Sequence, residues 1–168
     1  PLIKAMVDEN ISMGSPIEKA VAENLLPFIR QADLFANKYG CVVTNPPYMG
    51  SKGLNSTLKV FAQDNYPDSK SDLFAMFIER NISFVNKSGS VGMITMQSWM
   101  FLSSFEKLRE IILAQHTIIN MAHYGSRAFD SISGEVVSTT AFVLGSNYYP
   151  KYKGNYFRLV DGNSESEK

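Results

Sequence analysis

A short apolar run that ends in two consecutive prolines constrains this chain more than any other stretch. Residues 39–44 are mostly apolar and are followed at once by Asn45-Pro46-Pro47-Tyr48. Proline has no backbone N–H and a fixed φ, so neither a helix nor a sheet ladder continues through this sequence. The residue before a proline is kept out of the α region, which predicts an extended Asn45. The pattern therefore predicts a buried strand that stops in a rigid turn.

The turn combines hydrogen-bond acceptors with an aromatic ring. The Asn45 side chain and the Pro46 carbonyl can accept, and Tyr48 offers a face on which a planar group can stack. An amine conjugated to a ring is a poor nucleophile because its lone pair is delocalised. Two acceptors that each take one N–H favour a more tetrahedral nitrogen, and acceptors placed where positive charge develops stabilise the transition state. The turn therefore suits a planar group that carries an –NH2.

Helix signals recur along the chain. Ser15 and Glu18 have the spacing of a capping box, and Pro27 is expected to kink the following helix or to divide it. Ser71 is the predicted cap of a later helix, and Ser103 is predicted to open another capping box. The predicted helices are 16–36, a short helix near 56–63 within a polar, lid-like loop over 49–70, 71–86, and 103–115.

Apolar strands alternate with these helices. Residues 90–96 are apolar nearly throughout, as in parallel strands covered on both faces, and Gly89 before them is predicted to stop the preceding helix. Cys41 is expected to be a small buried side chain. The order indicates half of a doubly wound α/β sheet, with the turn where ligands bind at the carboxyl ends of strands. The predicted strands are 39–44, 90–96, 117–122 and 136–144, with an extra strand within 147–160 and a disordered tail over 163–168.

The turn and three later segments together resemble a known family. Asn45-Pro46-Pro47-Tyr48 after an apolar strand resembles the catalytic motif of S-adenosylmethionine-dependent amino-methyltransferases, which act on DNA adenine, RNA or protein glutamine. Residues 49–53, 71–79 and 134–144 resemble the adenine-specific DNA methyltransferases of BREX phage-defence systems, of the PglX type. Fused restriction–modification methylases are more distant relatives. The resemblance extends over nearly the whole chain.

The resemblance implies a fold, a reaction and its residues. The expected fold is the later part of a Rossmann-like methyltransferase sheet that uses S-adenosylmethionine. The expected reaction is methyl transfer to the N6 amine of an adenine flipped out of double-stranded DNA. Asn45, Pro46, Pro47 and Tyr48 are the expected catalytic residues, and Tyr48 together with Phe129 is expected to hold the base.

Further roles follow by position in the family pattern. Asp33 is placed where the family contacts the adenine ring of the cofactor, and an acid at the surface of a helix end is the alternative reading. Lys52 and Lys59, with Lys70, are candidates for contacts to DNA phosphates, and solvated surface lysines are the alternative.

The family's early cofactor motifs are not found before the first strand. Neither a glycine-rich turn nor an acidic ribose ligand precedes residue 39. We therefore expect a helical segment over 1–38, the C-terminal half of a catalytic domain over 39–160, and a polar tail over 161–168. Alone, this chain is expected to be inactive and to bind S-adenosylmethionine weakly or not at all.

The composition of the chain argues against several other classes of protein. Sixteen basic and sixteen acidic residues give a net charge of zero, whereas a free-standing DNA binder shows a basic surplus. The single cysteine excludes an internal disulfide, and His116 and His123 lack the spacing of metal ligands, so no metal is expected. No apolar run approaches ~18 residues and no signal peptide is present, so a soluble, cytoplasmic protein without a membrane partner is expected.

Two other functions stay open at this point. The same chemistry on a protein glutamine or on RNA would use the same turn. A non-catalytic interaction module could also retain the fold. In the favoured reading, double-stranded DNA is the partner, and other subunits of a defence or restriction system are further candidates.

Overall fold

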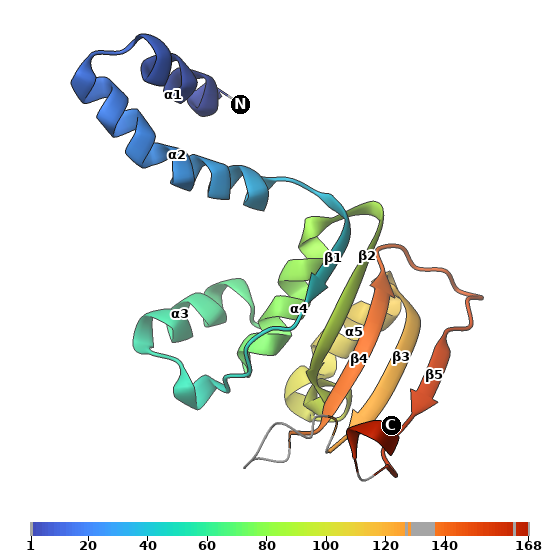
Figure 1. Ribbon diagram of the computed structural model, residues 1–168. Helices are drawn as coiled ribbons and strands as arrows, with labels where there is room; N and C mark the ends of the chain where they lie inside the picture. Colours follow the sequence, from blue (N-terminus) through green and yellow to red (C-terminus); the bar gives the residue numbers. More distant parts are fainter. Residues whose placement is uncertain (1, 127, 129–136, 163, 168) are drawn as a thin grey trace. The chain divides into compact units, whose positions relative to one another are not determined.

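The computed structural model describes residues 2–126, 128, 137–162 and 164–167. The chain divides into two compact units, Pro1–Lys38 and Tyr39–Lys168, which are described separately. Figure 1 shows the helices of the first unit and the sheet of the second.

The first unit is a pair of helices, α1 (Leu2–Met13) and α2 (Pro16–Ala36), that pack against each other. The predicted capping box is present: the Ser15 backbone N–H donates to Glu18 Oε2 at 2.7 Å, and the Glu18 N–H donates to Ser15 Oγ at 3.4 Å. Pro27 lies inside α2, which is one helix rather than two. Sequence periodicity did not predict α1.

The second unit is built on a mixed five-stranded sheet of order β1-β2-β4-β3-β5 (Figure 1). β1 is parallel to β2, and β3 is parallel to β5, while β4 is antiparallel to both of its neighbours. β5 confirms the extra strand predicted near the C-terminus. The strands are β1 (Tyr39–Thr44), β2 (Val85–Met96), β3 (Thr117–Gly125), β4 (Thr139–Gly145) and β5 (Asn155–Arg158).

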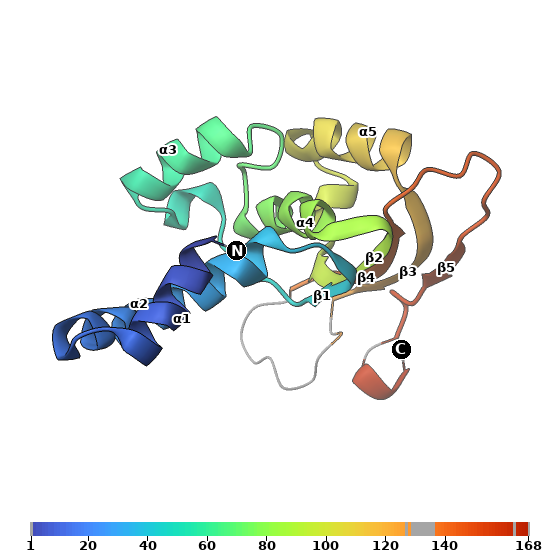
Figure 2. The ribbon, with the colours of Figure 1, turned by 90° about the horizontal axis from the view of Figure 1, so that it is seen from above.

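Two helices, α4 (Leu73–Phe84) and α5 (Glu106–Gln115), cover the same face of this sheet (Figure 2). Alternate side chains of a strand point to opposite faces, so one set enters the core and the other faces away. The fully buried large side chains are Phe74 and Ile78 of α4, Leu108 and Ile112 of α5, Val91 of β2, and Phe142 and Leu144 of β4. The other face carries an open apolar trough of about 610 Å³ that crosses β1, β2, β4 and β3.

The position of β1 overturns two predictions. Among the described strands β1 pairs only with β2, so it is an edge strand rather than a buried one. Cys41 is consequently exposed, and Val43 is 79% exposed. Residues 90–96 of β2 also differ from the prediction, because their side chains are alternately half-buried and buried rather than covered on both faces.

The predicted helix boundaries around α4 also change. Asp72, and not Ser71, is the N-cap, since the Asp72 side chain accepts from the Phe74 N–H. α4 ends at Phe84 and the chain enters β2 directly, so Gly89 is a strand residue and not a helix stop. A Cβ at Gly89 would lie 2.9 Å from the Tyr39 carbonyl oxygen, which explains why glycine is needed at this crossing with β1.

Smaller elements complete the second unit. α3 (Ser56–Asn65) confirms the short helix predicted near 56–63. The predicted capping box at Ser103 is absent, because Ser103–Phe105 form a 3-10 turn (η3) and Phe105 is the N-cap of α5, without a side-chain cap. The tail contains a 3-10 turn, Glu165–Glu167 (η4).

Candidate active site

The Asn45–Tyr48 turn lies at the carboxyl end of β1. Because β1, β2 and β3 run in the same direction, their carboxyl ends lie at the same end of the sheet, which we call its carboxyl edge. Gln97 follows β2 at this edge, and Tyr124 lies near the end of β3. Asn45 is exposed and lines the trough on the open face, together with Tyr124. The amide that was predicted to be catalytic is therefore accessible to a ligand.

The end of β1 is held from beneath by a buried asparagine on α4. The Asn81 Nδ2 donates to Thr44 Oγ1 at 3.0 Å, and Asn81 is only 4% exposed. The same Nδ2 lies 3.4 Å from the Met93 sulfur in β2. Pro46 is buried just after this anchor. Asn45 thus follows a residue fixed by a hydrogen bond and precedes one fixed by packing.

The Tyr48 ring is half-buried and rests on the core. It meets the Phe74 ring edge to face, with centroids 6.1 Å apart and an interplanar angle of 82°. Burial raises the pKa of the Tyr48 hydroxyl above its usual value, so the phenol stays neutral at physiological pH. Phe74 therefore restricts the Tyr48 ring while leaving part of it exposed.

The chain after the turn is joined to the start of α4. Asp72 Oδ1 accepts from the Met49 N–H at 3.0 Å, and the Leu73 N–H donates to the Met49 carbonyl at 3.0 Å. The Ser51 N–H donates to the Ser71 carbonyl at 2.9 Å. One carboxylate, that of Asp72, thus caps α4 and holds the turn. Sequence reasoning missed this role because Ser71 and Asp72 are both good caps.

A polar pair at the same edge was not predicted as part of the site. A ring nitrogen of His123, at the end of β3, forms a hydrogen bond with Gln97 Oε1. The Phe101 ring lies 5.7 Å from the His123 ring. Among the residues that the structure describes, no group of three or more His, Cys, Asp or Glu side chains could hold a metal ion.

The remaining predicted residues are not all brought to the turn. Phe129 lies outside the described residues. Asp33 is an exposed residue of α2 in the first unit. Lys52 lies in a 3-10 turn, η1 (Ser51–Gly53), and Lys59 lies on α3, and both line a second pocket of about 340 Å³. In the described part of the chain, no helix is long and apolar enough to cross a membrane.

The mixed sheet and the helices that cover it have the arrangement of part of a Rossmann-like methyltransferase fold. A Listeria monocytogenes protein assigned to the class I S-adenosylmethionine-dependent methyltransferases superimposes with a TM-score of 0.53 at 13% identity, over 73% of this chain and 37% of that one. The sequence model of the Eco57I restriction-modification methylases matches residues 4–129. The chain therefore belongs to the Eco57I restriction-modification methylase family.

Two curated proteins are similar to this chain in sequence over most of its length. The adenine-specific methyltransferase BrxX of Escherichia coli O9:H4 (strain HS) is 53% identical over 92% of this chain and 13% of its own length. The adenine-specific methyltransferase PglX of Lacticaseibacillus casei (strain Zhang) is 49% identical over 83% of this chain and 12% of its own length. The chain thus spans only a small part of the relatives that it matches.

Proposed function

We propose that this chain forms the methyl-acceptor side of an enzyme that methylates the N6 amine of adenine in DNA. The observation that supports this most directly is the accessible Asn45 amide beside the restricted ring of Tyr48. The two relatives that are about half identical to this chain are named adenine-specific methyltransferases. The match to the restriction-modification methylase family supports a role for the enzyme in a restriction–modification system, and a BREX phage-defence system is proposed alongside it.

The turn acts on the amine. Asn45 Oδ1 and the Pro46 carbonyl each accept one N–H of the adenine amine, so the nitrogen lone pair is directed away from the ring. S-adenosylmethionine, when bound, would supply an electrophilic methyl group, whose bond to sulfur would break as the bond to nitrogen forms, with S-adenosylhomocysteine as the leaving group. As the N–C bond forms, positive charge grows on the amine, and the two acceptors stabilise it before one amine proton leaves to solvent. Tyr48 carries no charge in this step and supplies a stacking surface.

The target base must leave the duplex to reach this edge of the sheet. Flipping costs a few kcal/mol, and stacking on Tyr48 offsets roughly 1–3 kcal/mol of that cost. Phe129 is the proposed second wall for the base, and Lys52 and Lys59 are the proposed contacts to DNA phosphates. Asp33 is the proposed contact to the adenine ring of the cofactor.

This chain contains the residues proposed to bind the substrate amine, but it lacks a complete binding motif for the cofactor. No cluster of glycines precedes β1, so the segment before β1 has no glycine-rich turn for the methionine part of S-adenosylmethionine. We infer that the isolated chain is inactive and that the cofactor binds chiefly to other parts of the full-length protein. Because the net charge of the chain is zero, we infer that DNA is also bound chiefly by other parts of the full-length protein.

The test uses the full-length protein with labelled S-adenosylmethionine and duplex DNA, digested to nucleosides. Label is expected in N6-methyladenine and should vanish in the Asn45→Ala variant. Asn147→Ala is the matched control, since this exposed asparagine follows β4 at the opposite edge of the sheet. Undiminished N6-methyladenine in Asn45→Ala would contradict the assignment. Label in RNA or in protein glutamine instead of DNA would favour those substrates. The absence of label from DNA, RNA and protein would favour a non-catalytic role.

A further inference from the structure

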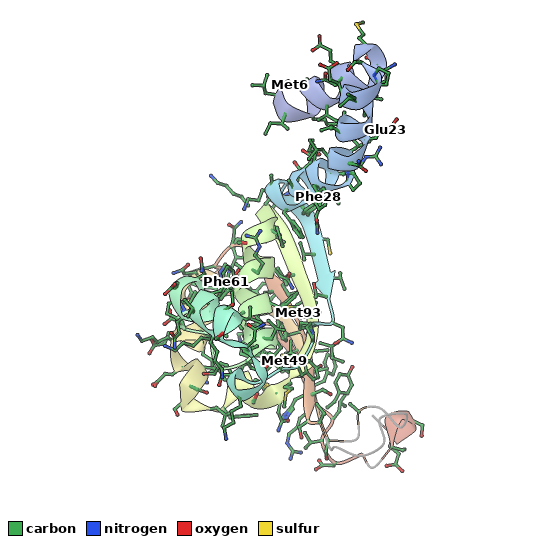
Figure 3. The ribbon with its side chains drawn as sticks, turned by 90° about the vertical axis from the view of Figure 1, so that its left-hand side faces the viewer. Met6, Glu23, Phe28, Met49, Phe61 and Met93 are labelled. Atoms are coloured by element: carbon green, nitrogen blue, oxygen red, sulfur yellow. The ribbon has the colours of Figure 1, made fainter. Side chains whose placement is uncertain are left out.

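A second pocket lies next to the proposed active site and differs from it in charge. It has a volume of about 340 Å³ and is formed by η1, α3 and the residues before α4. Figure 3 shows the side of the sheet unit where these segments lie, with Met49 and Phe61 labelled. The residues that line the pocket are Ser51, Lys52, Leu54, Lys59, Ala62, Gln63, Lys70 and Ser71.

The lining is cationic and rich in hydrogen-bond donors. Lys52, Lys59 and Lys70 contribute three ammonium groups, and no acidic residue is found among the described residues that line the pocket. None of these lysines forms an ion pair within 4.0 Å with the described part of the chain. Since the chain as a whole is neutral, this is a local concentration of positive charge that would bind an anion.

Lys59 stands on α3, Lys52 lies in η1, and Lys70 lies in the turn before α4. Leu54 and Ala62 are 4% and 1% exposed and form a small buried cluster with Met76 of α4. Asn55 caps α3 by accepting from the Leu58 N–H at 2.8 Å. Lys59 and Gln63 are four residues apart on α3 and so lie on one face of the helix. The backbone that carries Lys59 and Gln63 is therefore ordered before any ligand arrives, which lowers the entropic cost of binding.

The pocket is also close to the turn that is proposed to act on the base. Lys52 follows Tyr48 by four residues, which span at most about 14 Å. Gly50 forms a bridge with Asp72, so the lining segments at Ser51 and Ser71 are joined beside the turn. Successive nucleotides rise about 3.4 Å along one DNA strand, so this distance corresponds to about four nucleotides.

We propose that this lysine pocket binds a backbone phosphate of the DNA strand that carries the target adenine, within a few nucleotides of it. This proposal rests on the proposed function. A phosphate held here would fix the strand while the base is flipped toward Tyr48. Because a phosphate is the same at every nucleotide, the pocket adds affinity and register without reading sequence.

The test is the salt dependence of DNA binding by the full-length protein. Each phosphate neutralised by the protein contributes about 0.9 to the slope of log affinity against log salt concentration. Replacing all three lysines (K52Q, K59Q and K70Q together) should lower this slope by about 1, equally for unrelated DNA sequences. A fourfold rise in salt should then weaken the variant about 3.5-fold less than the wild type.

The matched control is Lys87→Gln, an exposed lysine in the part of β2 that lies away from the turn. Its slope should equal that of the wild type. An unchanged slope in the triple variant would overturn the proposal, as would a change on duplex RNA with none on duplex DNA. Binding is measured without methylation, so the two proposals fail separately. A wild type that makes no N6-methyladenine but shows the slope change contradicts only the proposed reaction.

Discussion

The side chain of Asn81 donates a 3.0 Å hydrogen bond to the hydroxyl of Thr44, the residue immediately before Asn45. The two residues are 37 positions apart in sequence, and Asn81 is buried under the sheet. A buried amide left without its partner costs free energy, so this contact holds the end of β1 in one place. Asn81 is thus a positioning residue for the turn and does not touch the reacting atoms.

Removing this contact should lower turnover more than substrate affinity. Thr44→Val and Asn81→Ala should each reduce kcat with a smaller change in KM, because the Asn45 acceptor is displaced. Thr44→Ser keeps the hydroxyl and should restore wild-type turnover. In a double-mutant cycle the two sites should couple by about 1 kcal/mol of unfolding free energy. Additive effects of the two changes would contradict a direct interaction.

The Tyr48 ring, rather than its hydroxyl, should carry base binding. Tyr48→Phe keeps the ring on Phe74 and should bind a DNA with an unpaired target adenine nearly as well as the wild type does. Tyr48→Ala should weaken that binding roughly 5- to 150-fold, equivalent to about 1–3 kcal/mol of stacking. Fluorescence titration with 2-aminopurine at the target position measures this difference. Equal losses in both variants would assign the role to the hydroxyl instead.

The cap of α4 offers a paired test of two neighbouring residues. Asp72→Ala should destabilise the protein by about 1 kcal/mol or more, because it removes the cap and also the acceptor for the Met49 N–H. Asp72→Asn retains a carbonyl oxygen and should lose less. Ser71→Ala should have little effect on thermal unfolding, although Ser71 was the predicted cap. A larger loss in Ser71→Ala than in Asp72→Ala would reverse the assignment.

Two glycines of the paired strands β1 and β2 should respond differently to replacement by alanine. Gly89→Ala places a methyl group 2.9 Å from the Tyr39 carbonyl oxygen and from the Val85 Cβ, and should cost about 1–3 kcal/mol of stability. Gly40→Ala meets nothing within 4 Å and should be tolerated. Thermal unfolding of both variants provides the comparison. Equal stability of the two would show that the strands separate without cost.

Glu79 of α4 should make stability depend on pH. Burial raises the pKa of its carboxyl above the usual 4.5, and the neighbouring Asp68 adds to the shift, while the nearby Ser69 hydroxyl opposes it. The folded state therefore binds the proton more tightly than the unfolded state, and stability falls as the pH rises above 4.5. Glu79→Gln should be more stable than the wild type at neutral pH, with the gain absent below pH 4.5. Denaturant unfolding at several pH values measures this difference.

Several features of the site follow from local chemistry and were predictable from the sequence. Two consecutive prolines end the strand whatever surrounds them, and the spacing of Ser15 and Glu18 forms a capping box within four residues. The alternation of apolar strands with helices indicated an α/β sheet, and the turn after Thr44 was placed at its carboxyl edge. Each of these depends on residues that are close in sequence, where steric limits and hydrogen-bond geometry decide the outcome.

Other features were decided only by contacts between distant residues. Cys41 and Val43 read as buried, yet β1 is an edge strand of the described sheet and leaves them exposed. Ser71 and Asp72 are comparable caps by sequence, but only the Asp72 carboxylate also accepts the hydrogen bond from the Met49 N–H. The lysines of three separate segments face one pocket because α3 packs on α4. The sequence by itself determined where the chain turns and which chemistry the turn offers, while tertiary packing decided what holds the turn and what surrounds it, because burial and long-range hydrogen bonds depend on which elements meet.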